Sequence, residues 1–250
     1  MTQLLIAAIA GLLGGAANAV AGGGSFITFP ALILTGMPPV AANQTSSVAL
    51  LPGGLASSWA YRSEIRSFDQ VALPVMVVPT LLGGGTGAAL LLLTPSRAFD
   101  LIIPWLVLIG ALTFAFGKRL QSRLNTNGKP IRLGAIRIFQ FVLGTYGGYF
   151  GGAVGIMMMA GWMLFGLTDI RAMNGMKTLM LAATKIVAVL VFAFFGHVYW
   201  IVALCLAVAA AVGGYAGAFM TKLISTEVLR TVISGAFFVV TAAFFYRGYG

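Results

Sequence analysis

Two lysines inside a strongly apolar segment are the sharpest chemical feature of this chain. Lys177 and Lys185 belong to the apolar run 172–196, and Lys185 lies deep within it. A charged side chain in such a run is costly and is a functional candidate by default. Every aspartate and glutamate falls near the end of an apolar segment, so none is placed to neutralise these lysines. An unpaired buried cation favours the binding of an anion.

The alternative for both lysines is structural, because a lysine near a helix end can extend its amine to the membrane surface. This alternative fits Lys177 better than Lys185. Asn174, Lys177 and Thr184 share one face of the predicted helix, and Lys185 lies about 80° round the helix from Lys177. We therefore take Asn174, Lys177 and Lys185 as candidate binding residues.

A second polar cluster begins the matching helix in the first half of the chain. Asn43, Gln44 and Thr45 stand at the start of the apolar segment 42–61, and Ser47 shares a helical face with Asn43. These are small polar groups without charge. We include Asn43, Gln44 and Thr45 among the candidate binding residues.

Glycine clusters precede both polar helices. Residues 22–24 are all glycine, and residues 147–155 include five glycines. Each cluster interrupts an apolar run too long for one span of about 20 residues. A helix break at membrane depth frees backbone groups that lipid cannot satisfy, so it lines a cavity or is buried in protein. Helices that restart near Ser25 and Gly155 would point their N-termini at the midplane, which suits an anion.

We therefore add Gly23, Gly24, Ser25, Gly152 and Gly155 to the candidate binding residues. The alternative is that these glycines only allow close helix packing. For two further clusters, at 83–87 and 213–217, packing is the interpretation that we favour.

The chain contains an internal duplication with an offset of 130 residues. The shift lays Gly36 on Gly166, and residues 83–88 fall on 213–218 without a change of register. A register held over so long a span indicates a repeat. A membrane protein built from two copies of one unit usually keeps its binding site where the copies meet.

Composition places the chain in a bilayer. Of its 250 residues, 60% are hydrophobic and 8% charged, whereas a soluble domain has roughly a quarter charged residues. The mean hydropathy is +1.00. The net charge of +10 would suggest nucleic acid in a soluble protein, but the basic residues stand between apolar segments, as the positive-inside rule requires. We expect no nucleic-acid partner. The single cysteine, Cys205, excludes an internal disulfide and a cysteine-rich metal site, and we expect no metal or cofactor.

The apolar pattern predicts eight segments, near 3–35, 42–61, 71–93, 98–117, 134–166, 172–196, 198–221 and 228–247. If all eight cross the membrane, nine of the lysines and arginines other than Lys177 and Lys185 lie on one side and four on the other. If the first and fifth segments are hairpins that return to the same side, the ratio becomes eleven to two. The positive-inside rule therefore favours hairpins. This leaves three crossings per copy, an odd number, which inverts one copy relative to the other.

The predicted fold is an all-α integral membrane protein of two inverted repeats, each of about four helical segments. The first segment of each repeat is a glycine-broken helix or re-entrant hairpin. The repeats are residues 1–117 and 134–250, joined by a basic cytoplasmic linker at 118–133. Both termini are expected outside the cytoplasm.

The order of these motifs resembles the TauE/SafE sulfite exporter family. The resemblance rests on Ala21-Gly22-Gly23-Gly24-Ser25-Phe26-Ile27 and on the glycine-rich stretch 144–153. Each is followed by a polar-headed helix, at Ala42-Asn43-Gln44-Thr45 and at Asn174-Gly175-Met176-Lys177. It covers essentially the whole chain. It implies a multi-pass transporter of the bacterial or archaeal inner (cell) membrane, with a small sulfur-containing anion as substrate: sulfite, thiosulfate or an organosulfonate.

We therefore expect a secondary transporter that works by alternating access around a midplane anion site, and not an enzyme. A passive anion channel is the first alternative. An intramembrane serine protease, with Ser25 as nucleophile and His197 as base, is disfavoured because the duplication repeats neither residue. A nucleotide-driven pump is disfavoured because the chain has no phosphate-binding loop. The expected partners are the substrate and the lipid bilayer, and a homodimer remains open.

Overall fold

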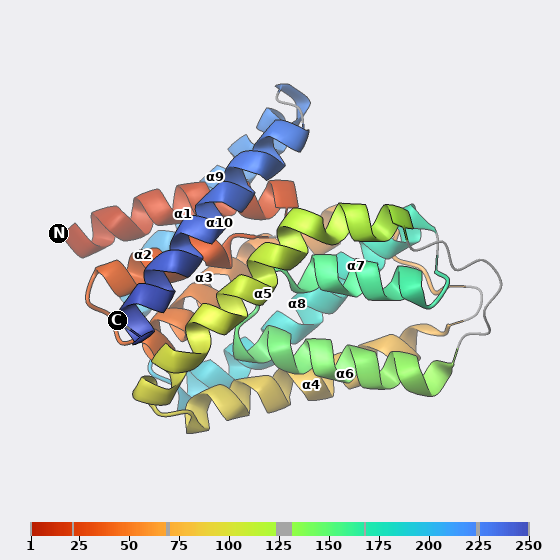
Figure 1. Ribbon diagram of the computed structural model, residues 1–250, viewed down its shortest axis with the longest axis horizontal. Helices are drawn as coiled ribbons and strands as arrows, with labels where there is room; N and C mark the ends of the chain where they lie inside the picture. Colours follow the sequence, from red (N-terminus) through yellow and green to blue (C-terminus); the bar gives the residue numbers. More distant parts are fainter. Residues whose placement is uncertain are drawn as a thin grey trace.

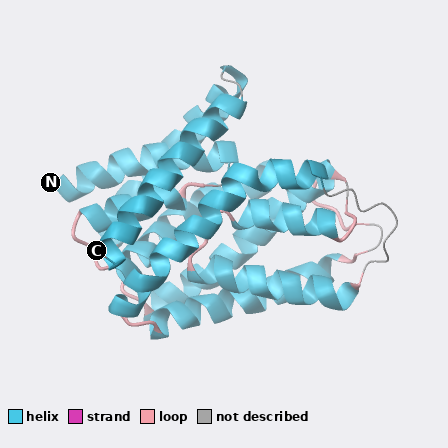
Figure 2. Cartoon of the chain, in the orientation of Figure 1, coloured by secondary structure: helices cyan, strands magenta, loops and turns pink. Residues whose placement is uncertain are grey.

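The computed structural model describes residues 2–21, 23–68, 71–123, 132–167, 169–223 and 226–249. Within these ranges the chain forms ten α-helices, and the only β-structure is an isolated bridge between Phe68 and Val71 (Figure 2). The helices are α1 (Thr2–Ala21), α2 (Ser25–Leu34), α3 (Pro39–Ala60), α4 (Leu73–Leu93), α5 (Ser96–Arg123), α6 (Leu133–Tyr149), α7 (Val154–Leu164), α8 (Ile170–Phe195), α9 (Trp200–Leu223) and α10 (Thr226–Tyr249). The all-helical prediction is confirmed. Half of the predicted linker, residues 124–131, lies outside the described residues.

Both long apolar segments are broken where glycine clusters predicted a break. The first stops after Ala21 and restarts at Ser25, and the second is interrupted between Tyr149 and Val154. In the second break Gly151 has φ of +84° and Ala153 has φ of +58°. These left-handed conformations cannot continue a right-handed helix, so the chain changes direction there.

The two helices on either side of each break run antiparallel. Gln3, near the start of α1, donates from Nε2 to Oγ1 of Thr35, just beyond the end of α2, at 3.5 Å. In the second pair the ring of Phe139, early in α6, lies against Gly161, late in α7. Each pair is therefore a helical hairpin whose tip is the glycine-rich break.

The duplication is visible in backbone conformation. Gly36 and Gly166, which the offset of 130 residues superimposes, both have φ of +83°. Each follows the end of the second hairpin helix, and its N–H donates to a carbonyl three residues earlier, Ile33 or Met163. Only glycine adopts this left-handed conformation without steric cost, which explains why the residue type recurs.

Hairpin helices from one half pack against helices of the other half. α1 lies along α9, and its counterpart α6 lies along α4. At these contacts Gly83 lies against the backbone of Phe141 and Gly213 against the backbone of Leu12. A Cβ at either glycine would overlap those atoms, so the packing interpretation of both clusters is confirmed at these positions.

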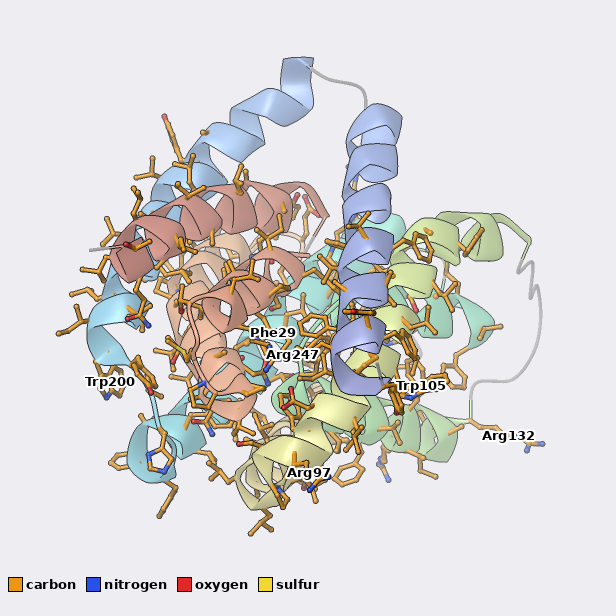
Figure 3. The ribbon with its side chains drawn as sticks, turned by 60° about the vertical axis from the view of Figure 1, so that its left-hand side comes forward. Phe29, Arg97, Trp105, Arg132, Trp200 and Arg247 are labelled. Carbon is orange, nitrogen blue, oxygen red and sulfur yellow. The ribbon has the colours of Figure 1, made fainter. Side chains whose placement is uncertain are left out.

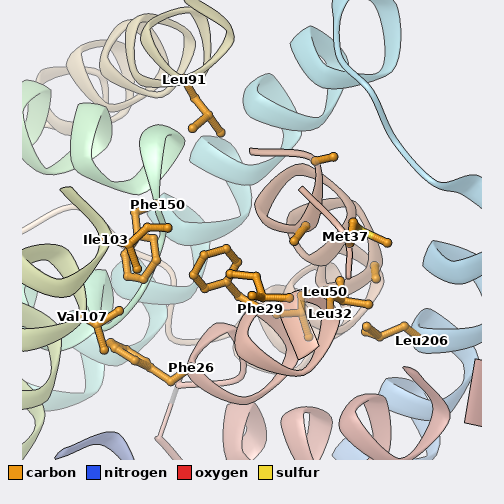
Figure 4. Packing of buried hydrophobic residues seen from close by; sticks show 14 of the residues in the cluster. Phe26, Phe29, Leu32, Met37, Leu50, Leu91, Ile103, Val107, Phe150 and Leu206 are labelled. Atoms are coloured by element: carbon orange, nitrogen blue, oxygen red, sulfur yellow. The ribbon is translucent and has the colours of Figure 1, made fainter. Parts of the chain in front are cut away.

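Phenylalanine rings fill the space where the two hairpin tips approach each other. Phe26 and Phe29 of α2 meet Phe150 of the α6–α7 break edge to face, with centroids 6.0 and 5.7 Å apart (Figure 4). Phe26 also stacks on Phe237 of α10 at 4.1 Å. All four side chains are buried. This aromatic core fixes the two tips relative to each other.

Exposed apolar side chains agree with a lipid environment. Leu34, Phe194 and Ile201 are 83%, 78% and 76% exposed, which is unfavourable in water for residues of this size. Among the described residues three helical stretches are long and apolar enough to cross a membrane: Leu73–Leu93, Ser96–Thr113 and Arg171–Phe195. Shorter apolar stretches, below that length in their described parts, are Thr2–Asn18, Ser25–Leu34, Val154–Leu164 and Trp200–Ala216.

The ends of the molecule differ in the residues that they carry. Figure 1 shows both termini at one end and the start of α6 at the other. Arg247 lies 3.5 Å from Asp100 near the terminal end, and Trp105 donates from Nε1 to the hydroxyl of Tyr249 at 3.0 Å. Arg132 lies apart from these residues, at the start of α6 (Figure 3).

Candidate functional site

The polar start of α3 ties the first half of the chain to the second. Residues 43–47 are all buried, so their polar atoms need partners within the protein. The Nδ2 of Asn43 donates to the backbone oxygen of Tyr149, the last residue of α6, at 2.8 Å. That carbonyl ends a helix and has no continuing helical partner. Asn43 therefore caps the break in the opposite hairpin.

Gln44 and Thr45 form hydrogen bonds to a different part of the chain, the turn between α8 and α9. The Oε1 of Gln44 accepts from the backbone N–H of His197 at 2.8 Å, and the Oγ1 of Thr45 accepts from the backbone N–H of Tyr199 at 3.2 Å. Both donors belong to the turn between α8 and α9. These two predicted site residues hold that turn and do not lie with the lysines.

The next hydroxyl of α3 reaches the first hairpin tip. The Oγ atoms of Ser46 and Thr28 are 2.6 Å apart, and the Thr28 hydroxyl donates to the backbone oxygen of Gly24 at 3.1 Å. Ser46 is then the donor to Thr28, because a hydroxyl has a single proton. Gly23, Gly24 and Ser25 are buried at the start of α2. A Cβ at Gly24 would lie 2.7 Å from the backbone oxygen of Gly14, so α1 and α2 pack tightly at this tip.

Lys185 lies at the tip of the second hairpin. Its Nζ donates to the Oγ of Ser47 on α3 at 3.2 Å. A Cβ at Gly151 would lie 2.8 Å from the same Nζ, so the ammonium rests directly on the backbone of the α6–α7 break. Asn43, one turn before Ser47, binds the end of α6 beside this point. Lys185, Ser47, Asn43 and the break therefore form one polar group shared by both halves.

Lys177 and Asn174 form a second group nearer the start of α8. The Nζ of Lys177 donates to the Oδ1 of Asn174 at 3.0 Å. The aliphatic stem of Lys177 lies against Gly155, in the first turn of α7, where an added Cβ would be 3.0 Å from its Cγ and Cδ. The eight residues between the lysines correspond to about 12 Å along the helix axis. The two cations therefore occupy successive positions along α8.

Gly152 connects the two hairpin tips. A Cβ at Gly152 would lie 2.8 Å from the ring of Phe26 on α2. The helix that follows, α7, has no side-chain hydrogen bond at its N-cap residue Ala153, and neither has α2 at Gly24. The first N–H groups of both helices thus have no side-chain cap, which leaves them suited to a negatively charged partner.

Neither lysine is paired with a carboxylate in the described part of the chain. The ion pairs found there join Arg66 to Asp169 and Arg247 to Asp100. Asp169 caps α8: the backbone N–H of Ala172 donates to it and, together with Arg66, lowers the pKa of its carboxyl below the ordinary 3.8. Acidic side chains therefore serve helix ends, and the lysines keep an uncompensated charge. No cluster of metal-ligating residues occurs among the described residues.

A cavity of about 520 Å³ opens at the end of the molecule that carries the α8–α9 turn. Its lining includes Ala41, Thr94, His197 and Tyr199. The Oγ1 of Thr94 accepts a hydrogen bond from the hydroxyl of Tyr149 at 3.2 Å. Tyr149 thus links the floor of the cavity to the end of α6, where Asn43 binds its backbone oxygen.

Three members of this arrangement were not among the sequence candidates: Ser47, Gly151 and Tyr149. Ser47 had a visible signal, since it shares a helical face with Asn43. Gly151 lies within the predicted break, but its left-handed φ shows only in the backbone. Tyr149 contributes a backbone oxygen, which its side-chain type does not reveal.

The fold and the site together define a class. Two glycine-broken helical hairpins, partly buried cations and a lipid-compatible surface are the construction of an integral membrane transport protein. The chain belongs to the sulfite exporter TauE/SafE family, whose profile matches residues 7–244. The resemblance inferred from the glycine motifs is confirmed, and the chain is a membrane transporter.

Curated relatives agree with this family. A probable membrane transporter protein of Haemophilus influenzae is 28% identical over 230 residues, covering 92% of this chain and 89% of the relative. Probable membrane transporter protein ORF9 of Sinorhizobium sp is 26% identical, covering 90% and 85%. Probable membrane transporter protein YfcA of Escherichia coli K12 is 24% identical, covering 96% and 88%. No solved structure matches the chain.

Proposed function

We propose that this protein is a secondary transporter of small sulfur-containing anions, of the class sulfite, thiosulfate or organosulfonate. The observation that carries the proposal is Lys185, whose ammonium rests on the α6–α7 break without a carboxylate partner in the described chain. A partly buried charge in this position is stabilised by an anion. The family description, sulfite exporter, supports sulfur oxyanions as that anion.

In this proposal each group at the break has a distinct role. Lys185 supplies the charge, and Ser47 orients its amine. Asn43 holds the end of α6 and so fixes the backbone of the break beside Lys185. The N-termini of α2 and α7 add partial positive charge from opposite hairpins. Lys177 is the next cation along the path.

Transport by alternating access would follow from two inverted repeats, residues 1–117 and 134–250. The matched packing of α1 on α9 and of α6 on α4 supports this symmetry. So does the identical φ of Gly36 and Gly166. Each half would rock against the other about the shared polar group, with the protein in the inner membrane and the linker at 118–133 in the cytoplasm.

The two other functions have less support. A passive channel needs a continuous open path, whereas buried phenylalanines fill the junction of the hairpin tips. A serine protease needs Ser25 and His197 in hydrogen-bond contact. Ser25 is buried in α2, the His197 side chain is exposed, and no hydrogen bond joins the two side chains in the described structure.

The proposal is tested with purified protein in liposomes. Sulfite, thiosulfate, taurine and sulfoacetate are offered on one side, with sulfate as the comparison, and initial fluxes are measured. Saturable flux of at least one sulfur anion supports a carrier, and linear flux without saturation supports a channel. Absence of flux for every anion contradicts the proposal. The topology is tested by fusing to the C-terminus a reporter that is active only in the cytoplasm. Activity of this reporter would contradict the hairpin arrangement, which places the C-terminus outside the cytoplasm.

A further inference from the structure

The α6–α7 hairpin contains buried polar atoms that have no hydrogen-bond partner. Among the described side chains, the buried nitrogen and oxygen atoms without a hydrogen-bond partner are the Nε2 and Oε1 of Gln140 and the Nε1 of Trp162. Both side chains have a relative exposure of 0%. Buried polar atoms are almost always hydrogen-bonded, because water is lost without replacement when they are not. Three such atoms on one hairpin indicate a ligand that forms the missing hydrogen bonds.

These atoms face the same part of the interior. Phe139, the neighbour of Gln140, lies against Gly161, the neighbour of Trp162, so the two side chains stand at the same level of the antiparallel hairpin. One turn on either side of Gln140, Ile136 and Leu143 belong to the same buried cluster as Trp162. The amide and the indole N–H are therefore directed into one cluster.

The cluster contains many flexible methionine side chains. Besides Trp162 and its edge-to-face neighbour Phe68, the cluster is dominated by methionines. Those that are fully buried are Met76, Met158, Met173, Met176 and Met180. Thioether side chains are unbranched and flexible, so they can rearrange to admit a small ligand more easily than branched or aromatic residues can.

A cation lies on the same side of α7. Lys177 packs its stem against Gly155, and Gly155 and Trp162 are seven residues apart, two turns along one helical face. The amine of Lys177 donates to Asn174, one turn nearer the start of α8. The hairpin and the adjoining part of α8 thus carry a positive charge, an indole donor and an amide that can both donate and accept.

We propose that Gln140, Trp162 and Lys177 form a second anion site, separate from the group around Lys185, which takes a singly charged hydrogen oxyanion such as hydrogen sulfite. Trp162 and the Gln140 amine group donate to the anion's oxygens, and its O–H donates to the Gln140 carbonyl. One lysine balances one negative charge. A fully deprotonated dianion lacks the O–H and leaves the carbonyl unpaired. The choice of sulfite rests on the proposed function; the site itself rests on the unpartnered atoms.

Fluorescence of Trp162 tests this site directly. The other tryptophans, Trp59, Trp105 and Trp200, are 71%, 52% and 55% exposed, so their joint replacement by phenylalanine leaves Trp162 as the single reporter. We expect a saturable change in its emission on titration with sulfite at a pH where hydrogen sulfite is present. An equal concentration of sulfate should cause no saturable change.

Gln140→Leu is the matching variant. It removes the hydrogen bonds to the anion and should weaken the apparent affinity seen by Trp162 about tenfold. Because leucine also removes two unpartnered buried atoms, the ligand-free variant should unfold at the same or a higher temperature. Gln3→Leu, the same substitution at the start of α1, should leave the Trp162 titration unchanged.

The outcomes separate the site from the transport function. Sulfite flux in liposomes with no response of Trp162 overturns the second site and leaves the transporter. A saturable response of Trp162 without flux keeps the site and overturns the transporter. An equal response to sulfate overturns the requirement for an O–H on the anion. An unchanged affinity in Gln140→Leu removes Gln140 from the site.

Discussion

Replacing Lys185 by methionine tests the proposed anion site most directly, because methionine keeps the length of the side chain and removes its charge. The Nζ of Lys185 lies 3.2 Å from the Oγ of Ser47 and rests on Gly151, with no carboxylate paired to it in the described chain. An anion about 4 Å from this ammonium gains about 4 kcal/mol at an effective dielectric constant of about 20. At 1.4 kcal/mol for each factor of ten, sulfite flux should fall about a thousandfold.

The measurement is the initial rate of sulfite entry into liposomes at a concentration well below saturation. Folding is followed by thermal unfolding of the same preparation. Removal of a partly buried ammonium that has no carboxylate partner should not lower the unfolding temperature of Lys185→Met. The pairing of lost flux with retained stability distinguishes a binding residue from a structural one. Arg132→Met is the matched control, since Arg132 is exposed at the start of α6.

A flux in Lys185→Met within about twofold of the wild-type rate would refute the electrostatic reasoning, because the calculated gain would then be absent. A drop in unfolding temperature together with lost flux would show that the amine is needed for packing. In that case its contact with Ser47, and not a substrate anion, would compensate the charge.

Three further predictions concern the break and its surroundings. Gly151→Ala should lower stability by about 1–2 kcal/mol and reduce flux, because φ is +84° and the new Cβ would meet the amine of Lys185. Gly134→Ala, where a new Cβ meets open space, should change neither stability nor flux. Equal effects of the two substitutions would contradict the role of Gly151. Asn43→Leu should lower the unfolding temperature by about 4–8 °C, because the free energy of unfolding falls by about 2 kcal/mol when the carbonyl that ends α6 loses its hydrogen-bond donor. An unchanged unfolding temperature would mean that a water molecule replaces the side-chain amide as donor. Asp169 has a lowered pKa in the folded state, so its stabilising effect is complete above its ordinary pKa of 3.8 and declines as pH falls through the folded pKa. Asp169→Asn should therefore flatten the acid side of the profile of stability against pH. A profile identical to the wild type would show that this carboxylate does not cause the loss of stability in acid.

Much of the fold could be predicted from residue patterns. The apolar runs indicated the helical segments, because a helix in lipid must satisfy its backbone within one apolar stretch. The glycine clusters indicated both breaks, and the structure interrupts the helices between Ala21 and Ser25 and between Tyr149 and Val154. The details differ at the second break: Gly147 and Gly148 remain inside α6, and the break follows them. Glycine permits a break but does not require one, so its exact position depends on packing.

The candidate site was predicted less completely. Residue type pointed to Lys185 and Asn43, since Asn43 is buried and Lys185 is partly buried within an apolar helix. Residue type could not separate Gln44 from Asn43, although Gln44 binds the α8–α9 turn and Asn43 binds the end of α6. Neighbours on a helix point in directions about 100° apart, and the surrounding helices decide what each side chain meets.

The sequence by itself placed the protein in a membrane, predicted an internal repeat, and put the two lysines that interrupt an apolar segment, Lys177 and Lys185, in the second half. These properties follow from composition, register and charge, which do not depend on contacts. Tertiary structure decided which candidates meet. Ser47 and Lys185 are 138 residues apart and lie in different halves of the chain, yet they share a hydrogen bond because α3 packs on α8. The offset of 130 residues pairs Ser47 with Lys177, not with Lys185. A contact between two halves depends on how their helices cross, and no pattern within either half contains that information.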